Sequence, residues 1–190
     1  MTDPGGDNGS TFVLAQRYLA DRVTVALDRV DPRAVGRAVE ILSAAPQIFV
    51  YGAGRSGIIG RAFAMRLVQL GLRAYVIGES VTPIVHRGDA VFILSGQGES
   101  YSSIQTANIV RREGAELVVL TARGTSKLAH TATHLVALDF AEDPDRARFA
   151  PLGTLFELAS LRLCDALIAE LMRARGETEA TMRRRHAIMV

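Results

Sequence analysis

The chain has little of what a disulfide, a cysteine metal site or a membrane anchor would need. Cys164 is its only cysteine and lies in an apolar helical run, where we expect a buried, unreactive side chain. No apolar run reaches the roughly 18 residues of a membrane span, and no basic segment precedes an apolar one at the N-terminus. We therefore expect a cytoplasmic protein with no membrane partner.

Excess charge of one sign is also lacking. The net charge is +2, from 22 basic and 20 acidic residues, and Lys127 is the only lysine. Such a nearly even balance does not predict a basic surface, so we expect no nucleic-acid partner. His86, His130 and His134 fall on different predicted loops and strand edges, so we expect no metal site.

What the chain does have is enough apolar sequence for one full core. With 190 residues, 48% of them hydrophobic, it suits one domain and is short for two. Residues 1–9 are rich in Gly and Asp without periodicity, so we expect them to be disordered and residues 10–190 to form a single domain.

Short apolar runs alternate with helical patterns along the rest of the chain. The predicted strands are 48–51, 73–77, 91–94, 117–120 and 135–138. The predicted helices are 12–30, 32–44, 58–70, 101–113, a short one after Ser126, 152–173 and a last short one within 177–190. Residues 143–151 are expected to form a loop. This alternation predicts an α/β fold, a three-layer αβα sandwich around a five-stranded parallel sheet, with additional N- and C-terminal helices.

A glycine-rich turn, YGAGRSG, joins the first predicted strand to a helix. At such a turn the free backbone N–H groups and the positive end of the helix dipole favour an anion. Gly52, Gly54 and Gly57 also fit the dinucleotide fingerprint G-x-G-x-x-G. Glu79 lies just after the second predicted strand, about where an acidic residue would meet a ribose hydroxyl. A dinucleotide-binding oxidoreductase is therefore one interpretation.

A second polar loop, Ser95 to Ser100, follows the third predicted strand. Both loops should lie at the carboxyl edge of a parallel sheet, where one compact phosphate could take donors from both. A polar turn is the simpler interpretation of this loop alone. A phosphate monoester on a small molecule suits the chain better than a dinucleotide, because there is no room for a separate substrate domain.

The order of YGAGRSG, FAMRL, GESVTP, LSGQGES, APLGTLFE and RRRHA resembles the sugar isomerase (SIS) domain family, and within it the 6-phospho-3-hexuloisomerase subgroup. The similarity runs from about Ile48 to Ala187. It implies an isomerase that interconverts D-arabino-3-hexulose 6-phosphate and fructose 6-phosphate in the ribulose monophosphate route of formaldehyde fixation. It also implies a homotetramer. A non-catalytic SIS module that binds a sugar phosphate stays open as an alternative.

The resemblance also implies roles for particular residues. Expected phosphate or substrate ligands, all from the two loops, are Gly54, Arg55, Ser56, Ser95, Gly96, Gln97, Gly98 and Ser100. Glu157 and His186 are the implied acid–base pair, and Glu79 and Thr82 could line the pocket. Three positions depart from the family pattern: Gln97 stands for the usual Ser, Ser100 for Thr and Ile188 for Asn.

Moving a carbonyl from C3 to C2 through a cis-enediolate needs one group that removes and returns a proton, but neither a metal nor a redox cofactor. We expect Glu157 to move the carbon-bound proton. We expect His186, reaching in from a neighbouring subunit, to handle hydroxyl protons and ring closure. The simpler alternatives are a surface carboxylate for Glu157 and an exposed tail residue for His186.

Overall fold

The structure, a computed structural model, describes residues 10–188, so the N-terminal segment expected to be disordered lies outside the described residues. Within that range five parallel strands form one sheet in the order β2-β1-β3-β4-β5. The strands are β1 Ile48–Gly52, β2 Ala74–Val76, β3 Ala90–Leu94, β4 Glu116–Thr121 and β5 His134–Ala137. All five carboxyl ends therefore meet at one edge, which confirms the predicted fold.

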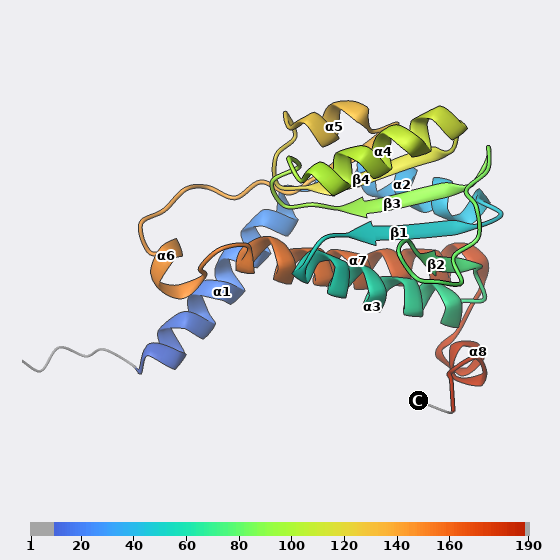
Figure 1. The fold of residues 1–190 in the computed structure, drawn as a ribbon. Helices are drawn as coiled ribbons and strands as arrows, with labels where there is room; N and C mark the ends of the chain where they lie inside the picture. The colour runs from blue at the N-terminus through green and yellow to red at the C-terminus, as the bar shows by residue number, and fades with distance from the viewer. Residues whose placement is uncertain (1–9, 189–190) are drawn as a thin grey trace, which may run out of the picture.

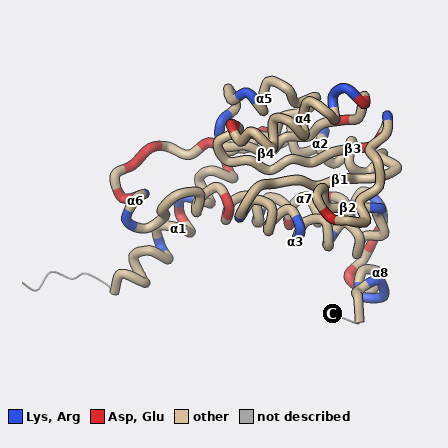
Figure 2. Tube along the Cα trace, in the orientation of Figure 1, with Lys and Arg blue, Asp and Glu red and all other residues tan. Residues whose placement is uncertain are grey.

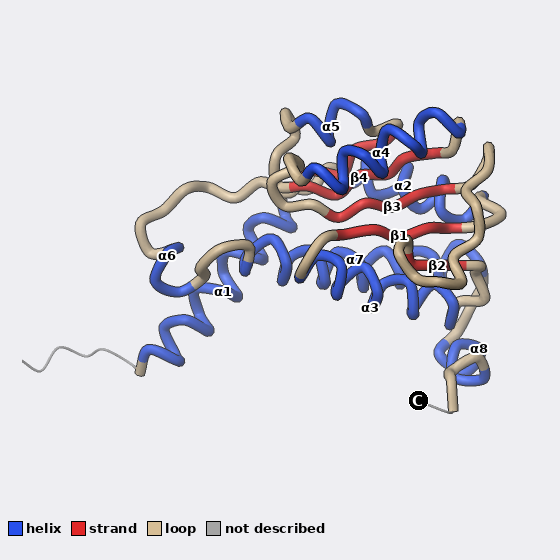
Figure 3. The backbone as a smooth tube through the Cα atoms, viewed as in Figure 1, coloured by secondary structure: helices blue, strands red, loops and turns tan. Residues whose placement is uncertain are grey.

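Helices cover both faces of this sheet (Figure 1 and Figure 3). The helices are α1 Thr11–Asp28, α2 Pro32–Ala44, α3 Arg55–Gln69, α4 Tyr101–Glu113, α5 Lys127–Thr131, α6 Arg146–Phe149, α7 Thr154–Arg175 and α8 Glu179–Arg184. One face packs against α4 and α5, and the other against α2, α3 and α7. Figure 2 shows that charged residues lie mainly on helices and loops, which leaves the sheet to the apolar core.

Alternation along the central strands divides the core between the two faces. Phe49, Val91 and Ile93 point to the α4 side, and Val50 and Phe92 point to the α7 side. All five are fully buried. Strands buried on both faces read as continuous apolar runs, which is why such short segments could be predicted.

Helix α1 extends away from the sheet and packs on α7 (Figure 1). The hydroxyl of Tyr18 donates to Oδ2 of Asp143 at 2.7 Å, and Arg22 lies 2.8 Å from the same oxygen. The hydrogen bond from Tyr18 lowers the pKa of the Asp143 carboxyl. These contacts attach the long connection between β5 and α7 to α1.

This connection contains the one helix that the sequence prediction missed. We expected a loop over residues 143–151, and that prediction is wrong for α6, Arg146–Phe149. The ring of Phe149 packs on Tyr18 with the ring centres 5.5 Å apart, so a contact distant in sequence supports the turn. The residue pattern around Phe149 does not predict that contact.

Candidate active site

The two predicted anion-binding loops start side by side at the carboxyl edge of the sheet. Gly52 ends β1 and is paired in register with Leu94, which ends the neighbouring strand β3. The loops Gly52–Gly57 and Ser95–Ser100 therefore leave the sheet next to each other, as the sequence predicted. Each leads directly into a helix, α3 and α4 respectively (Figure 1).

The first loop folds tightly on its own backbone. A Cβ atom on Gly52 would lie 2.8 Å from the backbone nitrogen of Gly57, and one on Gly57 would lie 2.5 Å from the carbonyl oxygen of Gly52. Only glycine fits at both positions, so the spacing that resembles a dinucleotide fingerprint has a packing reason in this turn. Helix α3 begins at Arg55, inside the turn and earlier than predicted, and no side chain caps it. Its first N–H groups are available to a ligand.

The second loop is braced from within and by helix α5. The hydroxyl of Ser95 is buried and accepts a hydrogen bond from the backbone N–H of Gly98 at 3.2 Å. Gly98 has φ 65°, and a Cβ there would lie 2.0 Å from Oγ of Ser126. Glu99 accepts from the backbone N–H of Lys127 at 3.1 Å, and its other oxygen lies 3.6 Å from the Lys127 ammonium. The position of the loop therefore depends on the start of α5.

The start of α4 completes this side of the site. Ser100 is the N-terminal cap residue, but its hydroxyl makes no capping hydrogen bond and lies 3.0 Å from the hydroxyl of Ser102. Two helices, α3 and α4, thus both begin after adjacent strand ends at the carboxyl edge, and neither has a side-chain cap. A phosphate placed between them could accept from backbone N–H groups of both and from the hydroxyls of Ser56 and Ser100.

Glu157 lies in the first turn of α7, against the second loop. Its neighbour Phe156 contacts the loop so closely that a Cβ on Gly96 would lie 3.0 Å from the Phe156 ring. The Glu157 side chain is only 13% exposed, and its Oε2 atom lies 2.8 Å from Nε of Arg55. The fold therefore brings together two predicted site residues that are distant in sequence, and Glu157 is not the surface carboxylate of the simpler interpretation.

The contact between Arg55 and Glu157 is an ion pair rather than a well-formed hydrogen bond. Oε2 of Glu157 is buried, yet no donor reaches it with hydrogen-bonding geometry. The short distance to Nε brings the charges close, but the N–H does not point at the oxygen, so we describe the attraction as electrostatic. A carboxylate oxygen without a hydrogen bond could accept a proton once a ligand reaches it.

His186 lies at the other end of the chain's fold. It is exposed and follows Arg185, the residue after the end of α8, whose guanidinium donates to the carbonyl oxygen of Gln69 at 3.3 Å. Gln69 ends α3, whereas Arg55 begins it, and 15 helical residues span about 21 Å. Figure 1 shows α8 at the opposite end of the α3–α7 layer from the start of α7, so one chain does not bring His186 to Glu157.

The two residues predicted to line the pocket follow β2. Glu79 forms an ion pair with Arg61 of α3 at 2.7 Å, and the hydroxyl of Thr82 donates to the carbonyl oxygen of Val76 at 2.6 Å. Both side chains already have partners within the chain. The ion pair places Glu79 beside α3, Thr82 is bonded to β2, and no hydrogen bond or ion pair among the described residues joins either side chain to Glu157 or to the second loop.

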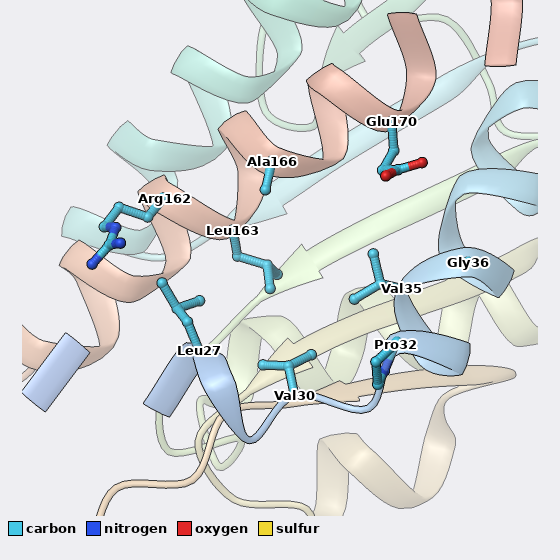
Figure 4. Close-up of a pocket in the computed structure, with 9 residues that line it drawn as sticks. All are labelled: Leu27, Val30, Pro32, Val35, Gly36, Arg162, Leu163, Ala166 and Glu170. Atoms are coloured by element: carbon cyan, nitrogen blue, oxygen red, sulfur yellow. The ribbon is translucent and has the colours of Figure 1, made fainter. Parts of the chain in front are cut away.

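A cavity of about 460 Å³ lies elsewhere, between the α1–α2 junction and α7 (Figure 4). Its walls include Leu27, Val30, Val35 and Leu163, and none of the predicted site residues lines it. Residues 10–188 contain no cluster of three or more His, Cys, Asp or Glu side chains that could hold a metal ion. None of the helices in that range is long and apolar enough to cross a membrane.

Comparison with known proteins agrees with this architecture. A family model described as the SIS domain matches residues 41–167. A 3-hexulose-6-phosphate isomerase from Methylomonas aminofaciens is 32% identical over 174 residues, which cover 90% of this chain and 96% of the relative. Another from Bacillus subtilis strain 168 is 37% identical over 145 residues, covering 74% and 78%.

A similar fold occurs in a crystal structure from Methanococcus jannaschii, for which the function of a 3-hexulose-6-phosphate isomerase has been inferred. That structure has a TM-score of 0.82 and 26% sequence identity, and the match covers 90% of this chain and 97% of the other. The family match and the identity over most of both chains agree with the sheet order and the two polar loops. The chain therefore belongs to the SIS domain family.

Proposed function

We propose that this protein is a 6-phospho-3-hexuloisomerase, which interconverts D-arabino-3-hexulose 6-phosphate and fructose 6-phosphate. The observation that carries the proposal is a buried carboxylate oxygen of Glu157 that lies beside the two polar loops and has no hydrogen bond. Relatives named as 3-hexulose-6-phosphate isomerases support this substrate over a dinucleotide.

The phosphate of the substrate would lie between the starts of α3 and α4. Backbone N–H groups of both helices, the hydroxyls of Ser56 and Ser100 and the amide of Gln97 could donate to it. This leaves the sugar chain to extend toward α7. The departure at Gln97 from the usual serine replaces a hydroxyl with a longer amide, so we expect the fit around the phosphate or the nearby sugar hydroxyls to differ from that of the relatives.

Glu157 would act as the base and then as the acid. Its carboxylate takes the proton from C2 of the 3-hexulose 6-phosphate, the C–H electrons form the C2=C3 bond, and the carbonyl oxygen on C3 becomes an oxyanion that is then protonated. The C2 hydroxyl next loses its proton to become the new carbonyl, and C3 takes the proton from Glu157. Donors near the oxyanion would lower the barrier.

His186 would handle the hydroxyl protons and the ring closure of fructose 6-phosphate, and a second copy of the chain would have to supply it. Helix α8 projects beyond the layer formed by α3 and α7 (Figure 1). The outer faces of these two helices carry exposed apolar side chains, including Ile58, Met65 and Leu161. If two copies met on this face about a two-fold axis across α3, the α8 end of one would approach the α3 start of the other. We propose that a homotetramer contains such shared sites.

An isomerase assay tests the reaction directly. Enzymatically prepared D-arabino-3-hexulose 6-phosphate should be converted to fructose 6-phosphate, and other ketose and aldose phosphates should be converted more slowly. Binding of sugar phosphates without turnover would instead identify a non-catalytic module. A thermal shift with NAD(H) and none with fructose 6-phosphate would favour the dinucleotide interpretation.

Subunit mixing tests the shared site. Glu157→Gln and His186→Ala proteins should each be inactive, but after co-refolding a mixed pair of copies contains one intact site. Random mixing should recover about a quarter of wild-type activity. No recovery, with mixed oligomers demonstrated by mass spectrometry, would remove His186 from the site of the neighbouring copy.

A further inference from the structure

The ion pair between Arg55 and Glu157 is unequal in mobility. The Glu157 side chain is 13% exposed and held by α7, whereas that of Arg55 is 61% exposed. The carboxylate therefore has little room to move, but the guanidinium can swing into solvent or toward another anion. No hydrogen bond with good geometry fixes it to Oε2, so charge alone opposes that movement.

Arg55 also lies where a phosphate is expected. It is the first residue of α3 and directly follows Gly54 of the first loop. A positive side chain is unfavourable at the start of an uncapped helix, because the helix dipole is positive there. A phosphate bound at the start of α3 would reverse that effect, and a guanidinium can bind two phosphate oxygens at once. The dianion therefore competes with Glu157 for the same cation.

We propose that Arg55 is a clamp released by the phosphate group of the substrate. In the free protein the guanidinium holds the carboxylate of Glu157 and occupies its proton-accepting oxygen. When a phosphorylated ketose binds, its phosphate draws the guanidinium away, and the carboxylate becomes free to take the carbon-bound proton. This inference rests on the proposed function, because it needs both the phosphate between the loops and Glu157 as the base.

Such a clamp would select phosphorylated sugars through the rate of proton removal as well as through binding. An unphosphorylated ketose would meet a base that is still paired. The same ketose together with a free phosphate-like anion would meet a released base, even though the two pieces are not joined. Activation by a separate anion is therefore the distinctive consequence, because a residue that only binds the substrate's phosphate would leave an unphosphorylated sugar unaffected.

Deuterium exchange into unphosphorylated D-fructose tests the clamp. Removing the C3 proton of fructose gives the C2–C3 enediolate, and its return from D₂O places deuterium at C3, which NMR detects. With wild-type protein we expect slow exchange that inorganic phosphite accelerates. With Arg55→Gln we expect exchange without phosphite to rise about threefold to tenfold, phosphite to have no effect, and turnover of fructose 6-phosphate to fall. Arg55→Lys, which keeps the charge, should retain part of the phosphite effect.

Arg37→Gln is the matched control, because Arg37 forms an ion pair with Glu40 at the same distance, 2.8 Å, on α2. Arg37→Gln should leave unchanged the rate of fructose exchange without phosphite, the rate with phosphite and the turnover of fructose 6-phosphate. If Arg55→Gln leaves fructose exchange unchanged, Arg55 is only a phosphate ligand. If the substitution slows exchange, Arg55 stabilises the oxyanion. Either result overturns the clamp. A wild-type protein that does not turn over fructose 6-phosphate would remove the proposed function and the clamp together, whereas normal turnover with either of those Arg55→Gln results removes the clamp alone.

Discussion

Two arginine–glutamate pairs, at opposite edges of the sheet, differ in how fully their charges are bonded. At the α8 end, Arg185 donates to both carboxylate oxygens of Glu177, at 2.9 and 3.0 Å. At the loop end, Arg55 approaches one oxygen of Glu157 without hydrogen-bonding geometry. The first pair uses its acceptors within the fold and fixes α8 in place. The second leaves Oε2 of Glu157 without a hydrogen bond, so only the attraction to Arg55 would have to be overcome before that oxygen could take a proton in the proposed reaction.

The Glu177 pair has further partners that the Glu157 pair lacks. The hydroxyl of Thr181 also donates to the Glu177 carboxylate, and Arg185 reaches the end of α3 through the carbonyl of Gln69. The hydrogen bond from Arg185 lowers the pKa of Glu177 to about 2. Burial thus does not by itself identify a reactive carboxylate, since both glutamates are largely covered. The number of donors that satisfy each one separates them.

The largest expected effect is on turnover when Glu157 loses its charge. Glu157→Gln should lower the turnover number by about 10²- to 10⁴-fold, the usual contribution of a positioned acid–base group. Its melting temperature should not fall, because the variant removes a buried charge that has no hydrogen bond at Oε2. Steady-state kinetics and calorimetry measure the two effects. Near-normal turnover would end the assignment of Glu157 as the base, with Glu40→Gln on α2 as the control.

Two glycines, one at the loop end and one at the α8 end, differ in how closely side chains surround them. Gly98 and Gly176 have nearly the same φ, 65° and 66°, but only Gly98 is crowded, by Ser126. Gly176→Ala should cost about 1 kcal/mol of the free energy of unfolding, from backbone strain alone. Gly98→Ala should cost more and lower turnover at least about tenfold, because the second loop must move away from α5. If Gly98→Ala and Gly176→Ala changed the free energy of unfolding in urea equally and changed turnover equally, α5 would not position the loop.

Acid should weaken the α8 end selectively. The pKa of Glu177 is lower in the folded protein, about 2, than its ordinary value of 4.5, so its stabilising contribution is fully present above pH 4.5. That contribution should be lost as the pH falls from 4.5 toward 2. Glu177→Gln should melt below wild type at neutral pH, and the difference should close over this range. A difference that does not depend on pH would mean that the ion pair does not stabilise the fold.

The smallest expected effect concerns the turn before α7. Leu152 is the only non-glycine residue with positive φ, 57°, among residues 10–188, and its carbonyl oxygen accepts a hydrogen bond from Arg146 at 3.2 Å. Leu152→Gly should relieve the strain and change the free energy of unfolding by less than about 1 kcal/mol, in the stabilising direction. Leu161→Gly, inside α7, should destabilise by at least about 1 kcal/mol, because it loses helix propensity and the partial burial of the leucine side chain. Loss of stability in Leu152→Gly would show that the turn is not strained.

Most of the fold could be predicted from the sequence, because its strands are buried on both faces and its helices carry local start and stop signals. Asp31 followed by Pro32 is a typical helix start, and in the structure the Asp31 carboxylate caps α2 by accepting from the backbone N–H of Arg33 at 2.9 Å. The adjacent positions of the two loops followed from the parallel sheet. Helix α6 could not be predicted, because contacts with α1 support it.

The site was less predictable than the fold. Family motifs singled out Glu157 and Arg55, but their ion pair depends on how α7 docks against the loops. The contacts of Ser126 and Lys127 with the second loop could not be predicted either. Helix α4 and strand β4 separate these two residues from Gly98 in the sequence. The separation of His186 from Glu157 could be seen only once α3 was placed between them, although a contribution from another subunit was expected.

The brace between α5 and the second loop has a practical consequence. Lys127 is the only lysine of the chain, its side chain is 77% exposed, and its ammonium lies 3.6 Å from a carboxylate oxygen of Glu99. Apart from the terminal amine, an amine-reactive fluorophore therefore has one attachment point, and it lies beside the proposed phosphate loop. The unaltered sequence can thus carry a single optical reporter at its own candidate binding site.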